Sequence, residues 1–384
     1  MLHRFLTGGE SHGPCLTTIV EGFPSGLNID VEQVNSDLTR RQGGYGRSGR
    51  QRIERDEVQF LGGIESGVTT GGPIVMQIAN RDYANFIKKE HPPITSPRPG
   101  HADLVGAIKY RYSDMRTALE RSSARETAAR TAAGAIAKQL LGQFDVQIGS
   151  FVTEIGGAKA DIDLASLLEP EATSALVCAT EDSPVRCPDP GATDEMKARI
   201  DNARRTGDTV GGIFVVWAIG LPVGLGSYVH WDRRLDGLLA QAVMSIQAIK
   251  GVEIGNAFSN AGSNGRDVHD QIFAGTNGVE RRTNRAGGLE GGVTNGQPLV
   301  IRAAMKPIST TINPLQTVDL ATGEQTTTQY QRSDFCAVPA AAVVGEAMVA
   351  WVLADALHEK LGGDSLGEMR ERFSILRSTA EVKP

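Results

Sequence analysis

A long apolar segment near the end of the sequence constrains the fold most. It reads PAAAVVGEAMVAWVLADALHEKLGG, from Pro339 to Gly363, and it is apolar on most sides until Asp355. Proline suits the first turn of a helix, and glycine suits the position just after its last turn. A helix that is apolar around most of its circumference has to be covered by other elements. The segment therefore predicts a helix buried between other parts of the fold.

Two further segments have helical patterns. Ser123–Gly142 is rich in alanine and leucine, and Glu126 follows Ser123 at the spacing of a capping box. Leu235–Gly251 predicts another helix, which ends near a glycine. The region from 156 to 205 is more acidic and less periodic, so we expect it to form a helical excursion over the surface.

A short G-x-T-x-G pattern recurs before runs of β-branched residues, at 67–78, 207–219 and 292–304. Each copy predicts a turn that leads into a buried strand, because valine and isoleucine fit the pleated sheet and glycine permits the turn. The repeated hairpin-plus-helix units predict an α+β fold with sheets inside and helices outside. We expect a single domain over residues 1–384, and the repeats raise the hypothesis of an internal duplication.

The charge balance argues against two classes of protein. The 384 residues carry a net charge of −6, whereas a nucleic-acid coat or a membrane-surface protein needs a positive field. We find no uninterrupted apolar run close to the roughly 20 residues that span a bilayer. The N-terminal MLHRFLTGGE has no signal-peptide character, and the 4 dispersed cysteines are typical of reduced thiols rather than of a zinc site. We expect a soluble cytoplasmic protein with no metal, nucleic-acid or membrane partner.

The stretch TGGESHGP raises the question of a serine nucleophile. Gly9–Gly13 fits G-x-S-x-G, the pattern that presents a hydrolase serine on a sharp turn. Such an elbow needs an oxyanion loop upstream, but only Met1–Gly8 precede it, and nothing downstream resembles an H-x-G-G loop. The sequence therefore disfavours Ser11 as an attacking group. His12, in a glycine-flanked loop, is the stronger candidate for chemistry, and a serine hydrolase stays the first alternative.

A basic loop follows at Arg40–Arg55, with six arginines and one acid in an acidic chain. Arginine forks match phosphate and carboxylate oxygens, and the intervening glycines let the backbone approach a ligand closely. RNA binding is the second alternative. However, the chain has no other basic tract and this loop has only one aromatic residue, Tyr45. A site for a small polyanion fits better.

Two features between Pro97 and Arg130 also suggest a site. His101 lies in a Pro/Gly loop, although such histidines are often simply exposed. Arg121–Arg125 places two arginines and two serines at the start of a helix, where free N–H groups and the helix dipole favour an anion. A helix cap with exposed arginines is the alternative reading.

Two segments near the C-terminus carry weaker signals. Met305–Thr310 puts a lysine and two hydroxyls at a strand end, where they can hold a phosphate. Arg332-Ser333-Asp334 precedes the apolar helix, and a carboxylate at that place is most often an N-cap. Cys336, among apolar neighbours, is better explained as a packed small residue than as a nucleophile.

Taken together, these blocks resemble the chorismate synthase family. Three carry the likeness: GESHG with RRQGGYGRSGR, RPGHAD with RSSARETAAR, and RSDFCAVPAA. Each is a weak motif alone, but their joint order and spacing run along nearly the whole chain. The resemblance implies a β-α-β sandwich of antiparallel sheets flanked by helices, assembled as a homotetramer. It also implies a 1,4-trans-elimination that converts 5-enolpyruvylshikimate 3-phosphate to chorismate and phosphate, with reduced FMN and no net redox change.

The resemblance further implies roles for individual residues. His12 matches the histidine that protonates the departing phosphate, and His101 matches the one that protonates the reduced flavin. Asp334 matches the aspartate proposed to take a flavin proton. Substrate recognition falls on Arg41, Arg47, Arg50, Arg125 and Arg332. FMN contacts fall on Arg121, Ser122, Ser123, Ala124, Gln247, Ala248, Gly291, Lys306, Pro307, Ile308, Ser309, Thr310 and Arg332. NADPH as a reductant, through Arg41 and Arg47, stays open, as does dependence on an outside reductant.

Overall fold

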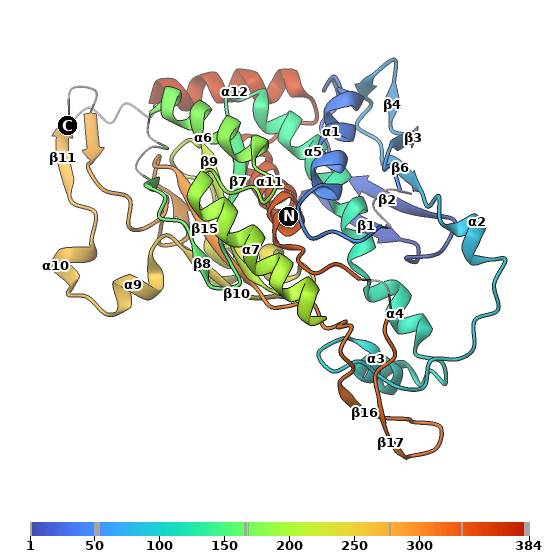
Figure 1. Cartoon of the computed structure of the whole chain (residues 1–384). Helices are drawn as coiled ribbons and strands as arrows, with labels where there is room; N and C mark the ends of the chain where they lie inside the picture. Colours follow the sequence, from blue (N-terminus) through green and yellow to red (C-terminus); the bar gives the residue numbers. More distant parts are fainter. Residues whose placement is uncertain are drawn as a thin grey trace.

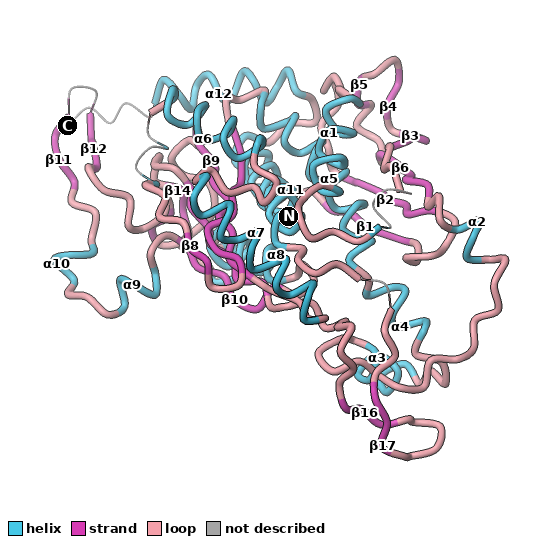
Figure 2. Tube along the Cα trace, viewed as in Figure 1, coloured by secondary structure: helices cyan, strands magenta, loops and turns pink. Residues whose placement is uncertain are grey.

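Two antiparallel sheets enclose a layer of helices (Figure 1; Figure 2). The computed structural model describes residues 2–49, 54–164, 167, 169–275, 278–331 and 333–379. The first sheet has the order β1 (Arg4–Gly8), β2 (Cys15–Glu21), β6 (Ile74–Ala79), β3 (Val58–Gly62). The second has the order β10 (Ile249–Ile254), β15 (Leu299–Met305), β9 (Gly212–Ile219), β7 (Gln147–Ile155), β8 (Ala158–Lys159). The α+β class expected from the sequence is confirmed.

Four helices lie between the sheets: α1 (Val31–Gln42), α5 (Thr127–Gly142), α8 (Leu235–Met244) and α11 (Val338–Leu361). Helix α5 packs on the first sheet, α11 packs on the second, and the two helices pack on each other. The expectation of sheets inside and helices outside was therefore wrong. The helices lie between the sheets because α11 is apolar on all sides. Such a helix cannot face water, so other elements have to cover it on every side.

The apolar helix predicted at 339–363 is confirmed as α11, which is buried along almost its whole length. By length and composition it could also cross a membrane, which corrects the expectation that no segment is apolar enough. However, its apolar stretch is entirely buried inside the protein. Glu346 and Asp355 interrupt the apolar run without exposing it, since both side chains are buried against hydrogen-bond donors.

The other two helices differ from the prediction at their ends. Helix α8 ends at Met244, because the chain turns at Ala248 with φ +67° and continues as β10, so the predicted helix to Gly251 was wrong. Helix α5 begins at Thr127, after the short η2 (Ala124–Glu126). Ser123 caps η2 by accepting the N–H of Arg125, while the Glu126 carboxylate binds Arg130 instead of completing a capping box.

The 156–205 region does form helices at the surface, although Ala192, Met196 and Ile200 of its second helix also pack in the main core. Its helices are α6 (Pro170–Asp182) and α7 (Pro190–Thr206). Beneath this segment, the outer face of the sheet is buried in a separate small core that includes Phe151, Val215 and Trp217. In the described part of the chain the first sheet has no such buried outer layer, and Leu6, Ile19 and Leu61 on its strands are exposed.

Smaller elements form a lobe and an arm (Figure 1). The lobe contains α3 (Asp103–Tyr110), α4 (Arg116–Ser122), β16 (Gln316–Val318) and β17 (Gln325–Thr327). The arm contains α9 (Ala257–Ala261), α10 (Gly265–Val268), β11 (Ile272–Gly275) and β12 (Gly278–Arg281). The remaining elements are α2 (Tyr83–Phe86), η4 (Trp231–Arg233), α12 (Leu366–Thr379), β4 (Ile64–Glu65), β5 (Val68–Thr69), β13 (Leu289–Glu290) and β14 (Val293–Thr294).

The two halves repeat one arrangement. The orders β1–β2–β6–β3 and β7–β9–β15–β10 match strand for strand, and a long helix ends each half. Two of the recurring threonines are equivalent as well. Thr69 donates to the oxygen of Pro24 and accepts from Leu27, and Thr294 does the same with Pro222 and Leu225. We propose that these correspondences reflect an internal duplication within one domain.

Glycine at one position lets the two long helices approach. A Cβ on Gly134 of α5 would lie 2.3 Å from both Cα and Cβ of Ala347 on α11. Gly142, on the last turn of the same helix, has open space around it. The helix spacing at the centre of the molecule therefore depends on the missing side chain of Gly134.

We expect Gly134→Ala to lower the free energy of unfolding by about 3 kcal/mol, because the backbones of both helices have to move apart. Gly142→Ala is the matched control and should change stability by less than about 1 kcal/mol, in the favourable direction, since alanine is the better helix former. Denaturant unfolding of the two variants measures the difference. Equal stability of the two would show that the helix contact tolerates expansion.

Candidate active site

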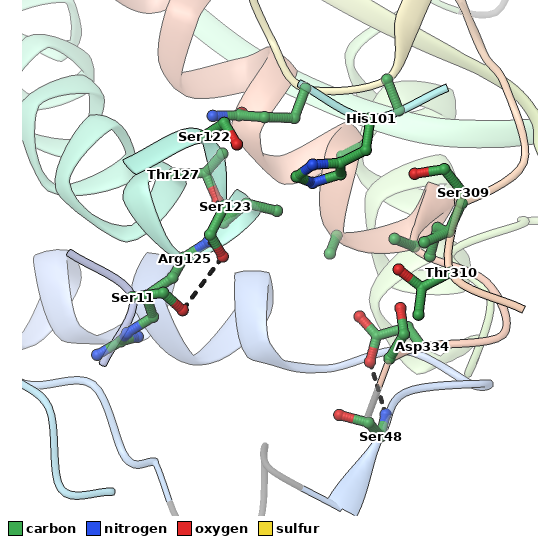
Figure 3. A pocket seen from close by; sticks show the side chains of 18 of the residues that line it. Ser11, Ser48, His101, Ser122, Ser123, Arg125, Thr127, Ser309, Thr310 and Asp334 are labelled. Carbon is green, nitrogen blue, oxygen red and sulfur yellow. Dashed lines mark hydrogen bonds between the residues drawn. The ribbon is translucent and has the colours of Figure 1, made fainter. Parts of the chain in front are cut away.

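A cavity of about 450 Å³ opens where the two long helices begin. The first residues of α5 and α11, the glycine loop after β1, the turn before β10 and the end of β15 all contribute to its wall (Figure 3). Free N–H groups and the positive dipole ends of two helices thus face the same space, which favours an anionic ligand. Ala337, Ala340, Ala341 and Val344 add an apolar wall from α11.

Most of the predicted site residues that the structure describes line this cavity. They are His12, His101, Asp334, Arg41, Arg47, Arg125, Ser122, Ser123, Ala124, Gln247, Ala248, Lys306, Ile308, Ser309 and Thr310. Three predicted residues do not line it: Arg121, Pro307 and Gly291. Arg121 donates to the carbonyl oxygen of Thr7 at 2.8 Å, and Gly291 lies next to Tyr228. Arg50 and Arg332 fall outside the described residues.

One buried carboxylate holds two of the arginines. Asp56 accepts from Arg125 at 2.6 and 2.7 Å and from Arg41 at 3.1 Å. Burial lowers the pKa of Arg41 to about 10, although Asp56 opposes the shift. Arg41 therefore stays cationic at neutral pH, and its buried Nε has no hydrogen-bond partner among the residues that the structure describes. Buried Glu54 lies 3.9 Å from Arg125 as well, so two carboxylates orient these two cations at the cavity wall.

Asp334 binds the basic loop rather than capping α11. Its carboxylate accepts the N–H of Ser48 at 2.6 Å and pairs with Arg47 at 3.2 Å. The Nε of Arg47 is buried, and no residue in the described part of the chain forms a hydrogen bond with it. Cys336 is fully buried, and burial raises the pKa of its thiol to about 12, which makes it inert as a nucleophile.

His101 is held by a carboxylate and an arginine that the sequence analysis did not single out. Its Nδ1 lies 2.5 Å from Asp103, which also accepts three hydrogen bonds from Arg98, one of them from the backbone N–H. Burial alone would raise the pKa of Asp103, but hydrogen bonds from His101 and Arg98 outweigh it and lower that pKa. Arg98 also donates to Thr310 at 2.8 Å. The histidine loop is thereby fixed to the segment after β15.

His12 has a similar partner that was also missed. Glu120 of α4 lies 2.8 Å from its Nδ1 and accepts its backbone N–H at 2.7 Å. The neighbouring hydroxyl of Ser11 accepts from Ser123 at 3.2 Å (Figure 3). Ser11 lines the cavity next to His12, so both groups named by the hydrolase alternative lie at this site.

The far side of the cavity carries donors and one unpaired acceptor. Lys306 donates to the oxygen of Gly100 at 2.6 Å, and burial, together with Lys250, lowers the pKa of Lys306. Gln247 donates through Nε2 to Glu126 at 3.2 Å, while its buried Oε1 accepts no hydrogen bond from the described residues. A buried acceptor that forms no hydrogen bond is costly in free energy, so Oε1 of Gln247 points to a ligand with a matching donor. Among the described residues, no group of His, Cys, Asp or Glu side chains is arranged to hold a metal ion.

Known proteins resemble this chain over its whole length. The profile of the family described as chorismate synthase matches residues 3–358. A chorismate synthase of Desulforamulus reducens is 56% identical over 97% of each chain, and one of Chlorobaculum tepidum is 51% identical over 99% of each. A crystal structure of chorismate synthase superposes with a TM-score of 0.83, at 43% identity, over 100% of this chain and 99% of the other.

We expect Asp56→Ala to destabilise the fold by about 3–5 kcal/mol, because it leaves two buried guanidinium groups without their shared carboxylate. Glu57→Ala is the control from the adjacent position. The Glu57 side chain is 69% exposed and lies 3.6 Å from Arg81, so its loss should cost less than about 1 kcal/mol. Urea unfolding gives both values, and similar losses in the two variants would contradict the role of Asp56.

Proposed function

This chain belongs to the chorismate synthase family, and we propose that its cavity carries out the reaction of that family. The reaction removes phosphate from 5-enolpyruvylshikimate 3-phosphate to give chorismate, and the enzyme is a lyase that depends on reduced FMN. The observation that carries the proposal is the convergence of Arg41, Arg47 and Arg125 with His12 and His101 on one cavity.

The arginines suit the charge of the substrate. It bears two carboxylates and a phosphate, and guanidinium groups bind both kinds of oxyanion through paired hydrogen bonds. Arg41 and Arg125 share one aspartate, and Arg47 pairs with Asp334, so each cation is oriented before a ligand arrives. The Nε atoms of Arg41 and Arg47 have no partner within the described ranges, so they are donors that a ligand can use. We infer that Arg50 and Arg332 take part as well.

The residues on the other side of the cavity fit FMN. Gln247 offers a buried acceptor, Lys306 a cation, and Ser309 and Thr310 hydroxyl groups at a strand end. Ser122, Ser123, Ala124, Ala248 and Ile308 line the same space. When bound, reduced FMN supplies the transient electron that weakens the scissile C–O bond. NADPH as the reductant, through Arg41 and Arg47, remains a hypothesis that an anaerobic assay with NADPH and oxidised FMN would test.

The protein's own part is proton transfer, orientation and exclusion of water. We infer that His12 gives a proton to the departing phosphate and that His101 exchanges a proton with the cofactor, with Asp334 as a third proton-handling group. The apolar wall from α11 keeps water away from the reacting atoms. Glu120, Asp103 and Arg98 hold the two imidazoles in place.

With dithionite-reduced FMN under anaerobic conditions, the protein should convert the enolpyruvyl substrate to chorismate, followed by absorbance. His12→Ala and His101→Ala should each lower the rate by about 10²- to 10⁴-fold, as expected for lost proton-transfer groups. His269→Ala, on the exposed arm, is the control and should keep the wild-type rate.

Three results would decide against this assignment. Absence of turnover by the wild-type protein would remove the enzyme activity itself. Labelling of Ser11 by a fluorophosphonate, with a larger loss in Ser11→Ala than in His101→Ala, would favour the hydrolase alternative. Salt-sensitive RNA binding that survives His12→Ala would favour the RNA-binding alternative.

We also propose that the chain forms a homotetramer, and that the outer face of the first sheet is one of its contacts. Leu6 pairs with Ile19 across β1 and β2, and Ile19 pairs with Val75 across β2 and β6, so the three side chains form a row. The corresponding face of the second sheet is buried under the 156–205 segment. An apolar row on an open sheet is suited to a second copy of the same chain. We expect the assembly to be soluble and cytoplasmic.

Ile19→Lys should reduce the molar mass in solution, because it places a charge in the middle of that row. Ile375→Lys, on the exposed side of α12, is the matched control and should leave the mass unchanged. Light scattering after size exclusion measures both, with four chain masses expected for the wild type. An unchanged mass in Ile19→Lys would exclude this face as a contact.

A further inference from the structure

We propose that Glu120 is a positioning residue that fixes the proton of the His12 ring on Nδ1 and directs Nε2 toward the ligand. The inference rests on the proposed function in one respect, namely that His12 exchanges a proton with a ligand in the cavity. Glu120 itself does not line the cavity, so it acts through His12 and not by touching the substrate.

The contacts of Glu120 determine which ring nitrogen carries the proton. One carboxylate oxygen lies 2.8 Å from Nδ1 of His12, and the other lies 3.1 Å from Nδ1 and accepts the His12 backbone N–H at 2.7 Å. An ionised carboxylate can only accept hydrogen bonds, so Nδ1 has to be the donor. The imidazole then has a single nitrogen, Nε2, that can gain or lose a proton during the reaction.

A second contact fixes the plane of the ring. Phe86 of α2 stacks on the His12 ring with centroids 4.7 Å apart and an interplanar angle of 15°. His91 stacks on the opposite face of Phe86 at 3.8 Å and binds the Phe86 carbonyl through Nε2. Glu120 fixes the edge of the imidazole and Phe86 fixes its face, so rotation about either axis would break a contact.

The backbone that carries His12 is fixed as well. The backbone oxygen of Glu120 accepts the N–H of Ser11 at 3.2 Å, and Asn80 donates to the oxygens of Glu10 and Gly13. Gly9 has a φ of +101°, and a Cβ there would lie 2.3 Å from the oxygen of Cys15. The loop therefore accepts only glycine at its start and is held from both sides.

Proton transfer from His12 to the departing phosphate breaks one N–H bond and forms one O–H bond. The N–H bond at Nε2 breaks as an O–H bond forms on the departing phosphate, and the electron pair stays on Nε2. The ring becomes neutral and keeps its Nδ1–H bond to Glu120. A neutral imidazole with its proton on Nε2 would have no lone pair directed at the cavity. It could therefore not accept a new proton from the cavity. Glu120 thus prevents an unproductive tautomer.

The test compares Glu120→Leu and Glu120→Gln by nitrogen NMR of protein labelled at its 7 histidines, with His12→Gln to assign the signals. In the wild type, neutral His12 should show the proton on Nδ1. In Glu120→Leu the proton should move largely to Nε2, and kcat should fall by about 10- to 100-fold, less than the loss on removing the ring. KM and the dissociation constant for reduced FMN should change less than about threefold, because Glu120 touches neither ligand.

Glu120→Gln keeps the shape but has one acceptor oxygen in place of two, so its tautomer ratio and kcat should be intermediate. Because it preserves packing, it carries the test if Glu120→Leu does not fold. Asp103→Asn is the matched control on the second imidazole and should alter the His101 signals while leaving those of His12 in place. Unchanged His12 signals in both Glu120 variants, or a rise in KM that accounts for the whole loss, would overturn the proposal. The NMR result stands independently of turnover, so failure of the proposed function would be recognised separately.

Discussion

The contact between Gly134 on α5 and Ala347 on α11 sets the spacing on which the rest of the molecule depends. The two long helices can share one layer between the sheets only because one of them lacks a side chain where they meet. Gly345 plays the same part on the other side of α11, where a Cβ would lie 2.7 Å from Phe214 of β9. Close packing of small residues is therefore what allows one helix to be covered from both sides.

A buried charge network locks this packing in register. Glu346 of α11 accepts from Arg40 at 2.8 Å, from Lys138 of α5 at 3.1 Å and from Ser150 of β7 at 2.6 Å. Burial alone would raise the pKa of Glu346, but the neighbouring cations outweigh it and lower that pKa. A buried carboxylate is tolerable only with such partners, so the network specifies one arrangement of α1, α5, α11 and the second sheet. The cavity lies where α5 and α11 begin, and its shape follows from their alignment.

The cavity uses carboxylates mainly to hold other groups. Asp56 orients Arg41 and Arg125, Asp103 orients Arg98 and His101, and Glu120 orients His12. Each of these acids is at least nine-tenths buried. The cations and imidazoles are therefore positioned before a ligand binds, which lowers the ordering cost of binding and of reaching the reactive geometry.

The sequence by itself determined the α+β class, the buried helix α11, the three strands after the G-x-T-x-G turns, the family, and most of the residues that line the cavity. These follow from local patterns, in which hydrophobic periodicity, glycine positions and short motifs are read within a few residues of one another. Local patterns alone did not place the helices between the sheets, which only the family resemblance implied, and the sequence did not end α8 at Met244. It also did not reveal the holding roles of Asp56, Asp103 and Glu120. Those depend on pairs far apart in the chain, such as Gly134 with Ala347, Arg47 with Asp334 and His12 with Glu120. A buried acid that orients a cation looks like any other acid in the sequence, because its role comes from burial and from partners that only the tertiary structure supplies.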